Sequence, residues 1–128
     1  MKHHIETAVV CVLVNEKNIP VCKVEYYEDE ENNFYYVFMP IYQNIDTLPP
    51  EKFHGIQGID LKQRKQSYIR KNYLPTFITE RAPIVTRTNL DELCREAGID
   101  CYHPLLWLKH TRMQYFGDDY IFTEGDTI

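Results

Sequence analysis

Hydrophobic residues concentrate in three segments of the first third of the chain. Residues 5–14 are almost wholly apolar and rich in β-branched side chains, which is typical of a strand buried on both faces. Residues 19–28 alternate between polar and apolar side chains, and residues 34–42 are rich in aromatic ones. The pattern predicts an antiparallel β-meander whose polar turns lie at residues 15–18 and 28–33.

The turn lengths also predict how these strands pair. If Val14 faces Ile19 across the first turn, Cys11 lies opposite Cys22, and the two thiols are reduced neighbours on adjacent strands. The face that this register assigns to the core is apolar almost throughout, as a half-buried sheet requires. It pairs Tyr26 with Tyr35 and comprises Thr7, Val9, Cys11, Leu13, Cys22, Val24, Tyr26, Tyr35, Val37, Met39 and Ile41.

The first strand would lie at an edge of a simple meander, although it is the most apolar of the three. An exposed apolar edge promotes aggregation, because its free backbone groups pair with other chains. We therefore expect a further strand to cover it, with residues 76–80 and 120–123 as the two candidates.

The second half of the chain favours helices. After a long loop over residues 43–59, Asp60 fits an N-cap, and the residues that follow predict a helix over 61–73. Residues 76–88 are expected to be extended or irregular around Pro83. Two shorter helices, the first ended by Gly98, and a terminal hairpin are expected at residues 89–97, 104–110 and 112–123.

These elements predict a single α+β domain over residues 1–128. An N-terminal antiparallel β-meander within residues 1–45 packs against two or three helices, and the helical part over 60–128 ends in a C-terminal β-hairpin. We find neither a secretory signal nor an apolar run of about 20 residues, the length of a membrane span. We therefore expect a soluble cytoplasmic protein with no membrane partner.

Charge is segregated along the chain. The net charge of −5 argues against a protein that coats nucleic acid generally. Residues 61–90 nevertheless carry seven Lys or Arg and a single acidic residue, Glu80, while residues 1–60 and 91–128 are each strongly acidic. A basic segment between two acidic ones is the most informative feature of the sequence.

The basic segment interleaves cations with aromatic rings. Phosphates attract cations and nucleotide bases stack on flat rings, so this mixture indicates an anionic ligand, either nucleic acid or a nucleotide. The alternative is that the charges are neutralised within the fold. The candidate ligand-binding residues are Lys62, Arg70, Lys71, Tyr73, Arg81 and Arg87. We expect the anion at Arg70 with Lys62 and Lys71 at its sides, and Arg81 or Arg87 closing from the following loop.

Acidic side chains suggest a second function. The turn at residues 28–31 and the acidic residues near the C-terminus could present carboxylates to a basic protein; the latter are Asp118, Asp119, Glu124 and Asp126. The alternative function is therefore an acidic protein-binding inhibitor or accessory factor of a nucleic-acid-handling enzyme, of the kind that phage and mobile elements encode.

Catalytic and metal chemistry have little support in the sequence. No H-E-x-x-H, G-x-S-x-G or phosphate-binding P-loop motif occurs, and the Cys and His residues after Cys94 lack zinc-site spacing. Cys94 is expected to be a buried thiol. Gly55 and Gly58 could expose backbone N–H groups to a phosphate, but the motif is too short to count. We therefore predict a non-catalytic binding protein with no metal and no cofactor.

Overall fold

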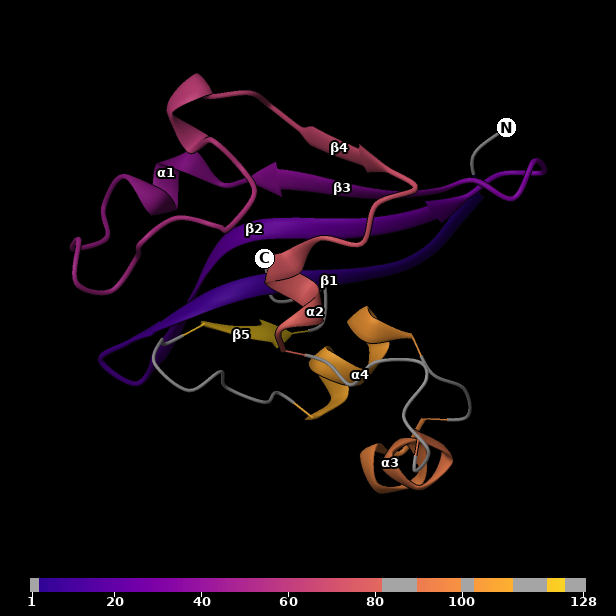
Figure 1. The fold of residues 1–128 in the computed structure, drawn as a ribbon. Helices are drawn as coiled ribbons and strands as arrows, with labels where there is room; N and C mark the ends of the chain where they lie inside the picture. The colour runs from indigo at the N-terminus through magenta and orange to yellow at the C-terminus, as the bar shows by residue number, and fades with distance from the viewer. Residues whose placement is uncertain (1–2, 82–89, 100–102, 112–119, 124–128) are drawn as a thin grey trace.

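A five-stranded antiparallel sheet forms the centre of the computed structural model, which describes residues 3–81, 90–99, 103–111 and 120–123. Its order is β4-β3-β2-β1-β5 (Figure 1). The strands are β1 His3–Val14, β2 Lys17–Glu28, β3 Phe34–Pro40, β4 Tyr68–Lys71 and β5 Tyr120–Thr123. The helices are α1 Tyr42–Ile45, α2 Thr76–Thr79, α3 Leu90–Ala97 and α4 Pro104–Thr111. The predicted α+β class with an N-terminal meander is confirmed.

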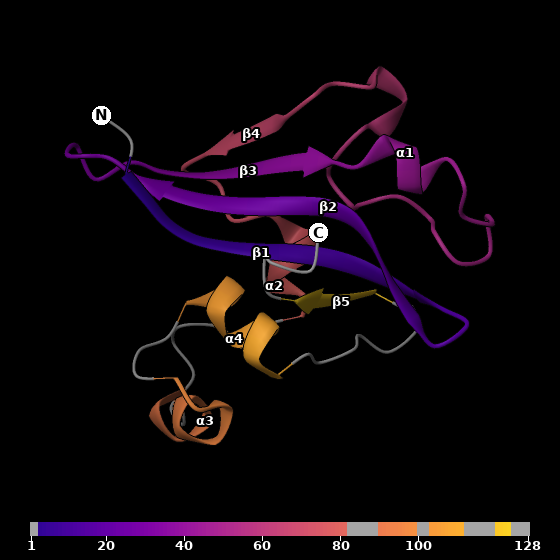
Figure 2. The ribbon, with the colours of Figure 1, turned by 180° about the vertical axis from the view of Figure 1, so that it is seen from behind.

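The helices gather on one side of the sheet. Helix α4 packs beside β1 and β5, and α3 packs on α4 farther from the sheet (Figures 1 and 2). Leu105 and Leu108 of α4 and Phe77 of α2 are fully or almost fully buried in one cluster with Val10 and Phe122 of the strands. This cluster is the core between sheet and helices. Within the described ranges, no helix is long and apolar enough to cross a membrane.

Strand β1 is buried on both faces, as its sequence predicted. All five residues from Ala8 to Val12 are 0% exposed. Val10 faces the helices and pairs with Phe122 of β5, whereas Val9 lies on the opposite face and pairs with Thr123. Of the two segments expected to cover the edge of this strand, residues 120–123 do so as β5, which completes the hydrogen bonding that β2 cannot supply. The other candidate, residues 76–80, contains helix α2 (Thr76–Thr79) and is not a strand.

The predicted register of the first hairpin is wrong. The loop has two residues, Asn15 and Glu16, both with positive φ (50° and 67°), so Val14 pairs with Lys17 and not with Ile19. A two-residue loop with positive φ at both positions matches the right-handed twist of the flanking strands. The sequence suggested a longer turn because Lys17 and Asn18 are also polar.

A bulge completes the difference in pairing. The register shifts between Val10 and Cys11, so that Cys22 lies opposite Val10 and Cys11 lies opposite Pro20. Cys22 belongs to the core cluster beneath the helices, whereas Cys11 contacts the Thr123 hydroxyl on the other face, with 3.6 Å between sulfur and oxygen. The prediction that Cys11 and Cys22 are cross-strand neighbours is therefore wrong.

The predicted register of the second hairpin is wrong as well. It differs by one residue, because Tyr26 pairs with Tyr36 and not with Tyr35. A slip of one residue exchanges the two faces of a strand. The prediction of the core face was right for β2 and wrong for β1 and β3. The strand residues in the core beneath the helices are Ala8, Val10, Val12, Val21, Cys22, Val24, Tyr26, Tyr36, Phe38, Tyr68, Tyr120 and Phe122.

The predicted basic helix over residues 61–73 does not form. Asp60 does cap a helical turn, its carboxylate accepting the Lys62 N–H at 3.1 Å, but this 3-10 turn covers only Leu61–Gln63. Arg64 then adopts a left-handed φ of 53°, and β4 follows. Tyr68 pairs with Phe38 on β3, and aromatic and β-branched neighbours of this kind outweigh a helical spacing of apolar residues.

Two of the four helices follow the sequence. Helices α3 and α4 confirm the elements predicted at residues 89–97 and 104–110. Gly98 ends α3 with a φ of 79°, and the Ile99 N–H donates to the Cys94 carbonyl at 3.0 Å. Cys94 is buried, as expected. The other two helices are short. Helix α1 lies where the sequence predicts the end of a strand and a loop, and α2 is a single helical turn within the segment predicted to be extended or irregular. The first arm of the predicted terminal hairpin, 112–116, lies outside the described residues.

Candidate functional site

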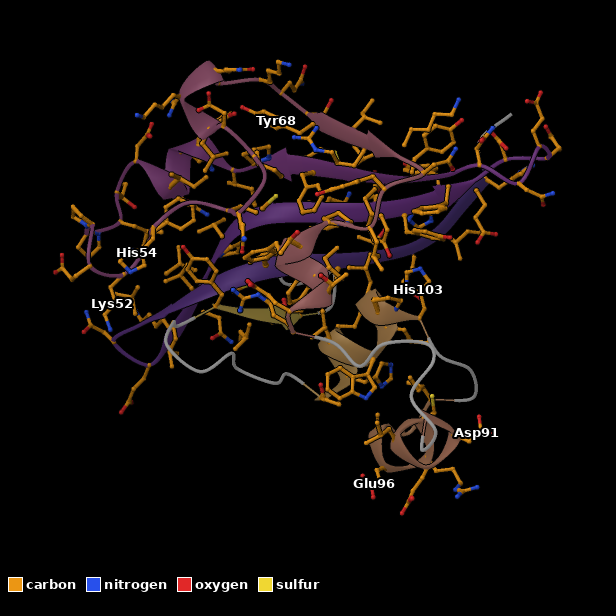
Figure 3. All side chains as sticks on the ribbon, viewed as in Figure 1. Lys52, His54, Tyr68, Asp91, Glu96 and His103 are labelled. Carbon is orange, nitrogen blue, oxygen red and sulfur yellow. The ribbon has the colours of Figure 1, made fainter. Side chains whose placement is uncertain are left out.

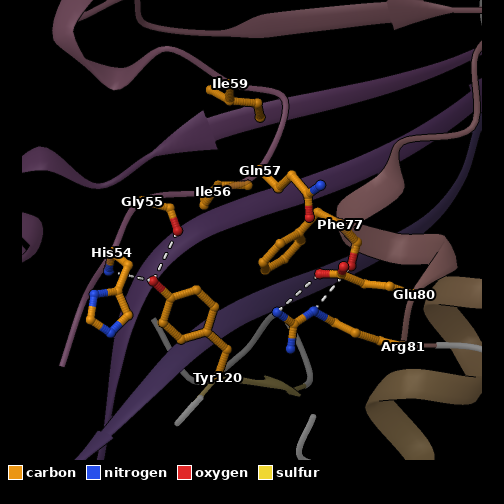
Figure 4. Close-up of a pocket in the computed structure, with 9 residues that line it drawn as sticks. All are labelled: His54, Gly55, Ile56, Gln57, Ile59, Phe77, Glu80, Arg81 and Tyr120. Atoms are coloured by element: carbon orange, nitrogen blue, oxygen red, sulfur yellow. Dashed lines mark hydrogen bonds and ion pairs between the residues drawn. The ribbon is translucent and has the colours of Figure 1, made fainter. Parts of the chain in front are cut away.

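A cavity of about 290 Å³ lies beside the helix-covered face of the sheet (Figure 4). Three distant parts of the chain build its wall: the loop 54–59, the turn that ends α2, and β5. The polar side chains on this wall belong to His54, Gln57, Glu80, Arg81 and Tyr120, and the rings of Phe77 and Tyr120 supply flat apolar surface. Among the predicted ligand-binding residues that the structure describes, Arg81 lies on this wall.

Tyr120 fixes the loop that forms one side of the cavity. Its hydroxyl donates to the Gly55 carbonyl at 2.9 Å and accepts the His54 backbone N–H at 2.8 Å. Its ring stacks on Phe53, with 5.7 Å between the centroids. Because Tyr120 belongs to β5, which pairs with β1, these bonds tie the loop to the sheet.

Arg81 contributes a buried cation to the opposite side. Its side chain is 4% exposed, and its guanidinium lies 4.3 Å from the ring centroid of Phe77 and 5.5 Å from that of Tyr120. The Arg81 Nε donates to the Phe77 carbonyl at 3.0 Å, which fixes the plane of the group. Contacts with two rings and a backbone bond help to fix the orientation of this cation.

Glu80 balances part of the charge of Arg81. Its Oε1 lies 3.5 Å from the Arg81 Nη2, whereas strong charge-assisted hydrogen bonds measure about 2.7–2.9 Å. The Glu80 side chain is 25% exposed at the cavity, so the contact is partly open to water. An anion in the cavity would share Arg81 with this carboxylate.

The other predicted cations do not gather at one place. Arg70 lies in β4, where its guanidinium donates to the carbonyls of Ile69 (3.1 Å) and Gly58 (2.8 Å). Lys71 follows it in the strand and therefore points to the opposite face, 5.8 Å above the Tyr35 ring. Lys62 and Tyr73 are both exposed. The structure thus places Arg70 and Lys71 on different faces, and Arg87 lies outside the described residues.

One cation of the basic segment is neutralised within the fold. Both terminal nitrogens of Arg64 donate to the Asp46 carboxylate, at 2.8 and 2.9 Å, and this pairing lowers the pKa of Asp46. The Arg64 guanidinium also lies 4.2 Å from the ring centroid of Tyr42. For this residue, neutralisation within the fold is the arrangement found.

The acidic turn between β2 and β3 is organised around one carboxylate. Asp29 accepts the backbone N–H groups of Glu31 (2.9 Å) and Asn33 (3.0 Å) and the Tyr35 hydroxyl (2.7 Å). The bond from Tyr35 is the main cause that holds the pKa of Asp29 far below its usual range. The Asp29 carboxylate therefore stabilises the conformation of the turn. The C-terminal acidic residues of the alternative function, Asp118, Asp119, Glu124 and Asp126, lie outside the described residues.

Sequence reasoning missed most of the cavity wall. His54, Gln57 and Tyr120 were not among the candidates, and the nearest signal was the pair Gly55 and Gly58, whose φ angles of 91° and 88° shape the loop. No group of three His, Cys, Asp or Glu side chains in the described part of the chain is placed to hold a metal ion. Comparison with protein-family models, curated proteins and solved structures gives no match to this chain.

Proposed function

We propose that this chain is a non-catalytic binding protein for a small, ring-bearing anion, namely a mononucleotide, held in the cavity at Arg81. The observation that carries the proposal is the buried guanidinium of Arg81 in a cavity wall that also contains the rings of Phe77 and Tyr120. A fixed cation suits a phosphate, and the rings suit a base.

The size of the cavity supports a single nucleotide. Pockets for small ligands enclose about 300–1,000 Å³, so a volume of about 290 Å³ matches the lower end of this range. A longer nucleic acid would require cations spaced along one surface. Arg70 and Lys71 lie on different faces, Arg64 is paired with Asp46, and the net charge is −5.

Titration calorimetry with the four ribonucleoside monophosphates tests the proposal, with adenosine and inorganic phosphate as matched half-ligands. We expect at least one monophosphate to bind and both half-ligands to bind at least about tenfold more weakly. Arg81→Met should weaken binding about tenfold or more, because a charge-assisted bond contributes about 1.5–3 kcal/mol. Glu80→Gln should tighten binding, because it removes the competing carboxylate.

The control variants lie in the same basic segment and on the rim of the cavity. Lys62→Ala should leave the affinity unchanged, and Gln57→Ala, at an exposed position, should weaken binding without affecting the core. If Arg81→Met fails to fold, the responses to Glu80→Gln and Gln57→Ala still test the site. Absence of monophosphate binding, or weaker binding in Glu80→Gln, would refute the proposal.

A further inference from the structure

We propose that the outer edge of β4 is a docking site for an extended acidic polypeptide segment, which adds a sixth strand to the sheet. This surface lies on β4 and the residues around it, away from the wall of the Arg81 cavity. The proposal stands on different residues from the proposed nucleotide site and does not depend on it.

The backbone of β4 presents hydrogen-bonding groups on its outer side. The Asn72 N–H, one residue after the strand, donates to the Phe34 carbonyl at 2.7 Å and so points toward β3. N–H and C=O groups alternate in direction along a strand, so those of Arg70 also point toward β3, and those of Ile69 and Lys71 point away. No strand of the described residues lies beyond β4 (Figure 1).

Exposed apolar side chains lie on β4 and in the residues directly after it. Ile69 is 49% exposed, Tyr73 53% and Leu74 44%, and these are three of the four large hydrophobic residues that are exposed in the described part of the chain. Edge strands are normally protected by being short or by carrying charged side chains, so three exposed apolar side chains on and after this strand are unusual. An incoming strand that pairs with β4 would cover Ile69 directly and would extend past Lys71 toward Tyr73.

The charge of the edge selects the partner. Residues 61–75 contain no Asp or Glu and five Lys or Arg, of which Arg64 pairs with Asp46, and Lys62, Lys65 and Lys71 are exposed. A second copy of the chain, pairing edge to edge, would bring these like charges together and is disfavoured. A segment with Asp or Glu at alternate positions would place carboxylates beside Lys71 and Lys65.

Arg70 supplies a specific contact for such a carboxylate. Its Nη1 donates to the Ile69 carbonyl, which points outward, so the guanidinium lies across the edge that the partner must approach. A carboxylate on the partner would accept from this guanidinium and draw it away from the carbonyl, leaving the Ile69 carbonyl to accept a backbone N–H. A basic or neutral segment offers the guanidinium no such alternative partner.

Single-stranded nucleic acid fits this edge less well. It shares the preference for cations, but its backbone has no pattern of N–H and C=O groups to match Ile69 and Lys71. Its bases stack on aromatic rings, and of the three exposed apolar side chains only Tyr73 is aromatic. The observations therefore favour a polypeptide strand.

Selection from a displayed library of random peptides of about ten residues tests the inference with the full chain as target. We expect the enriched peptides to be acidic and to bind at least about tenfold more weakly after N-methylation at alternate residues. Ile69→Pro should weaken binding to a similar extent, because it removes an outward N–H and leaves the β3–β4 bonds intact. Lys71→Glu should weaken binding, whereas Lys17→Glu, in the distant first hairpin, should not.

Several outcomes would overturn the inference. These are failure to enrich any acidic peptide, equal binding of the N-methylated peptides, and equal binding by Ile69→Pro that retains the wild-type circular dichroism. The N-methylated peptides keep the test valid if Ile69→Pro does not fold. Binding of a labelled oligothymidylate that Lys71→Glu abolishes and Ile69→Pro retains would assign the edge to nucleic acid. Nucleotide binding at Arg81 is measured separately, so either proposal can fail alone.

Discussion

Glu16 occupies a backbone conformation that favours glycine. Its φ of 67° lies in the left-handed region, which costs L-residues other than Asn, Asp and Gly about 1 kcal/mol. We predict that Glu16→Gly raises the free energy of unfolding by about 0.5–1 kcal/mol, measured by urea denaturation. Asn18→Gly, two residues later within β2, should lower it. A destabilised Glu16→Gly would contradict the strain inferred for this turn.

His103 makes the stability of the protein depend on pH. Its ring lies near the start of α4, remote from His54 (Figure 3), and packs 4.3 Å from the Tyr26 ring centroid. Its Nδ1 accepts the Leu105 N–H at 3.2 Å, and the described residues offer no partner to its buried Nε2. Burial therefore lowers the pKa of His103 below its ordinary value of 6.5, against the opposing effect of Glu6 and Glu28.

The direction of the pH dependence follows from this lowered pKa. As the pH falls below 6.5, the unfolded chain takes up a proton at His103 before the folded chain does. We predict that the contribution of His103 to the free energy of unfolding is fully present above pH 6.5. This contribution is lost as the pH falls through the pKa of the folded state. His103→Phe should flatten that part of the urea-denaturation profile. An unchanged slope between pH 7 and 5 would contradict the prediction.

Strand β1 is the strand whose central residues are completely buried, so a charge placed there should destabilise the protein. Val10 is 0% exposed and contacts the core beneath α4. We predict that Val10→Asp lowers the free energy of unfolding by several kcal/mol, because it buries a charge without a partner, and that loss approaches the whole stability of a small domain. Thermal melting followed by circular dichroism measures it. Lys17→Asp, at the exposed start of β2, is the control and should melt near wild type.

The elements of the meander could be predicted, but not their register. Composition alone identifies strands at residues 5–14, 19–28 and 34–42, because few other structures accommodate such apolar and aromatic runs. The register depends on whether the first turn has two residues or four, and Asn15 and Glu16 do not distinguish these lengths. Register can normally be inferred from which face of a strand is apolar. Both faces of β1 are apolar and buried, so this pattern does not distinguish one register from the other.

The predicted helix over residues 61–73 is absent for a different reason. Leu61, Tyr68 and Ile69 have a helical spacing, yet the structure uses Tyr68 and Ile69 as strand partners of β3. Local propensity favours a helix only weakly, and pairing with an existing aromatic strand decides the outcome. Once these residues form a strand, Arg70 and Lys71 must point to opposite faces, and the predicted grouping of cations around Arg70 cannot form.

The cavity joins residues that no local sequence pattern connects. Arg81 was selected for its charge alone, whereas His54 and Tyr120 are 66 residues apart and meet through a bond from the His54 N–H to the Tyr120 hydroxyl. That contact depends on β5 pairing with β1. Residues 120–123 were one of two candidates to cover β1, and choosing them places Tyr120 beside that strand. No sequence pattern predicts that Tyr120 also binds the loop 54–59.

The two proposed sites are connected through Arg70. Its Nη2 donates to the Gly58 carbonyl at 2.8 Å, and Gly58 lies within the loop 54–59 that lines the cavity. Arg70 itself does not contribute to the cavity wall. Loss of this bond should loosen the loop while leaving the Arg81 side of the cavity unchanged, since a hydrogen bond from a charged group contributes about 1.5–3 kcal/mol when well shielded and less at a half-exposed position.

We predict that Arg70→Met accelerates amide hydrogen exchange at Ile59 several-fold, because the Ile59 N–H bonds to the Ile56 carbonyl within the same loop. The exchange of Val10, in the core, should not change. Lys71→Met is the matched control, since it removes a neighbouring cation from the opposite face and leaves the Gly58 contact intact. Equal exchange at Ile59 in the two variants would show that the bond from Arg70 does not hold the loop, and that events at the edge of β4 do not reach the cavity.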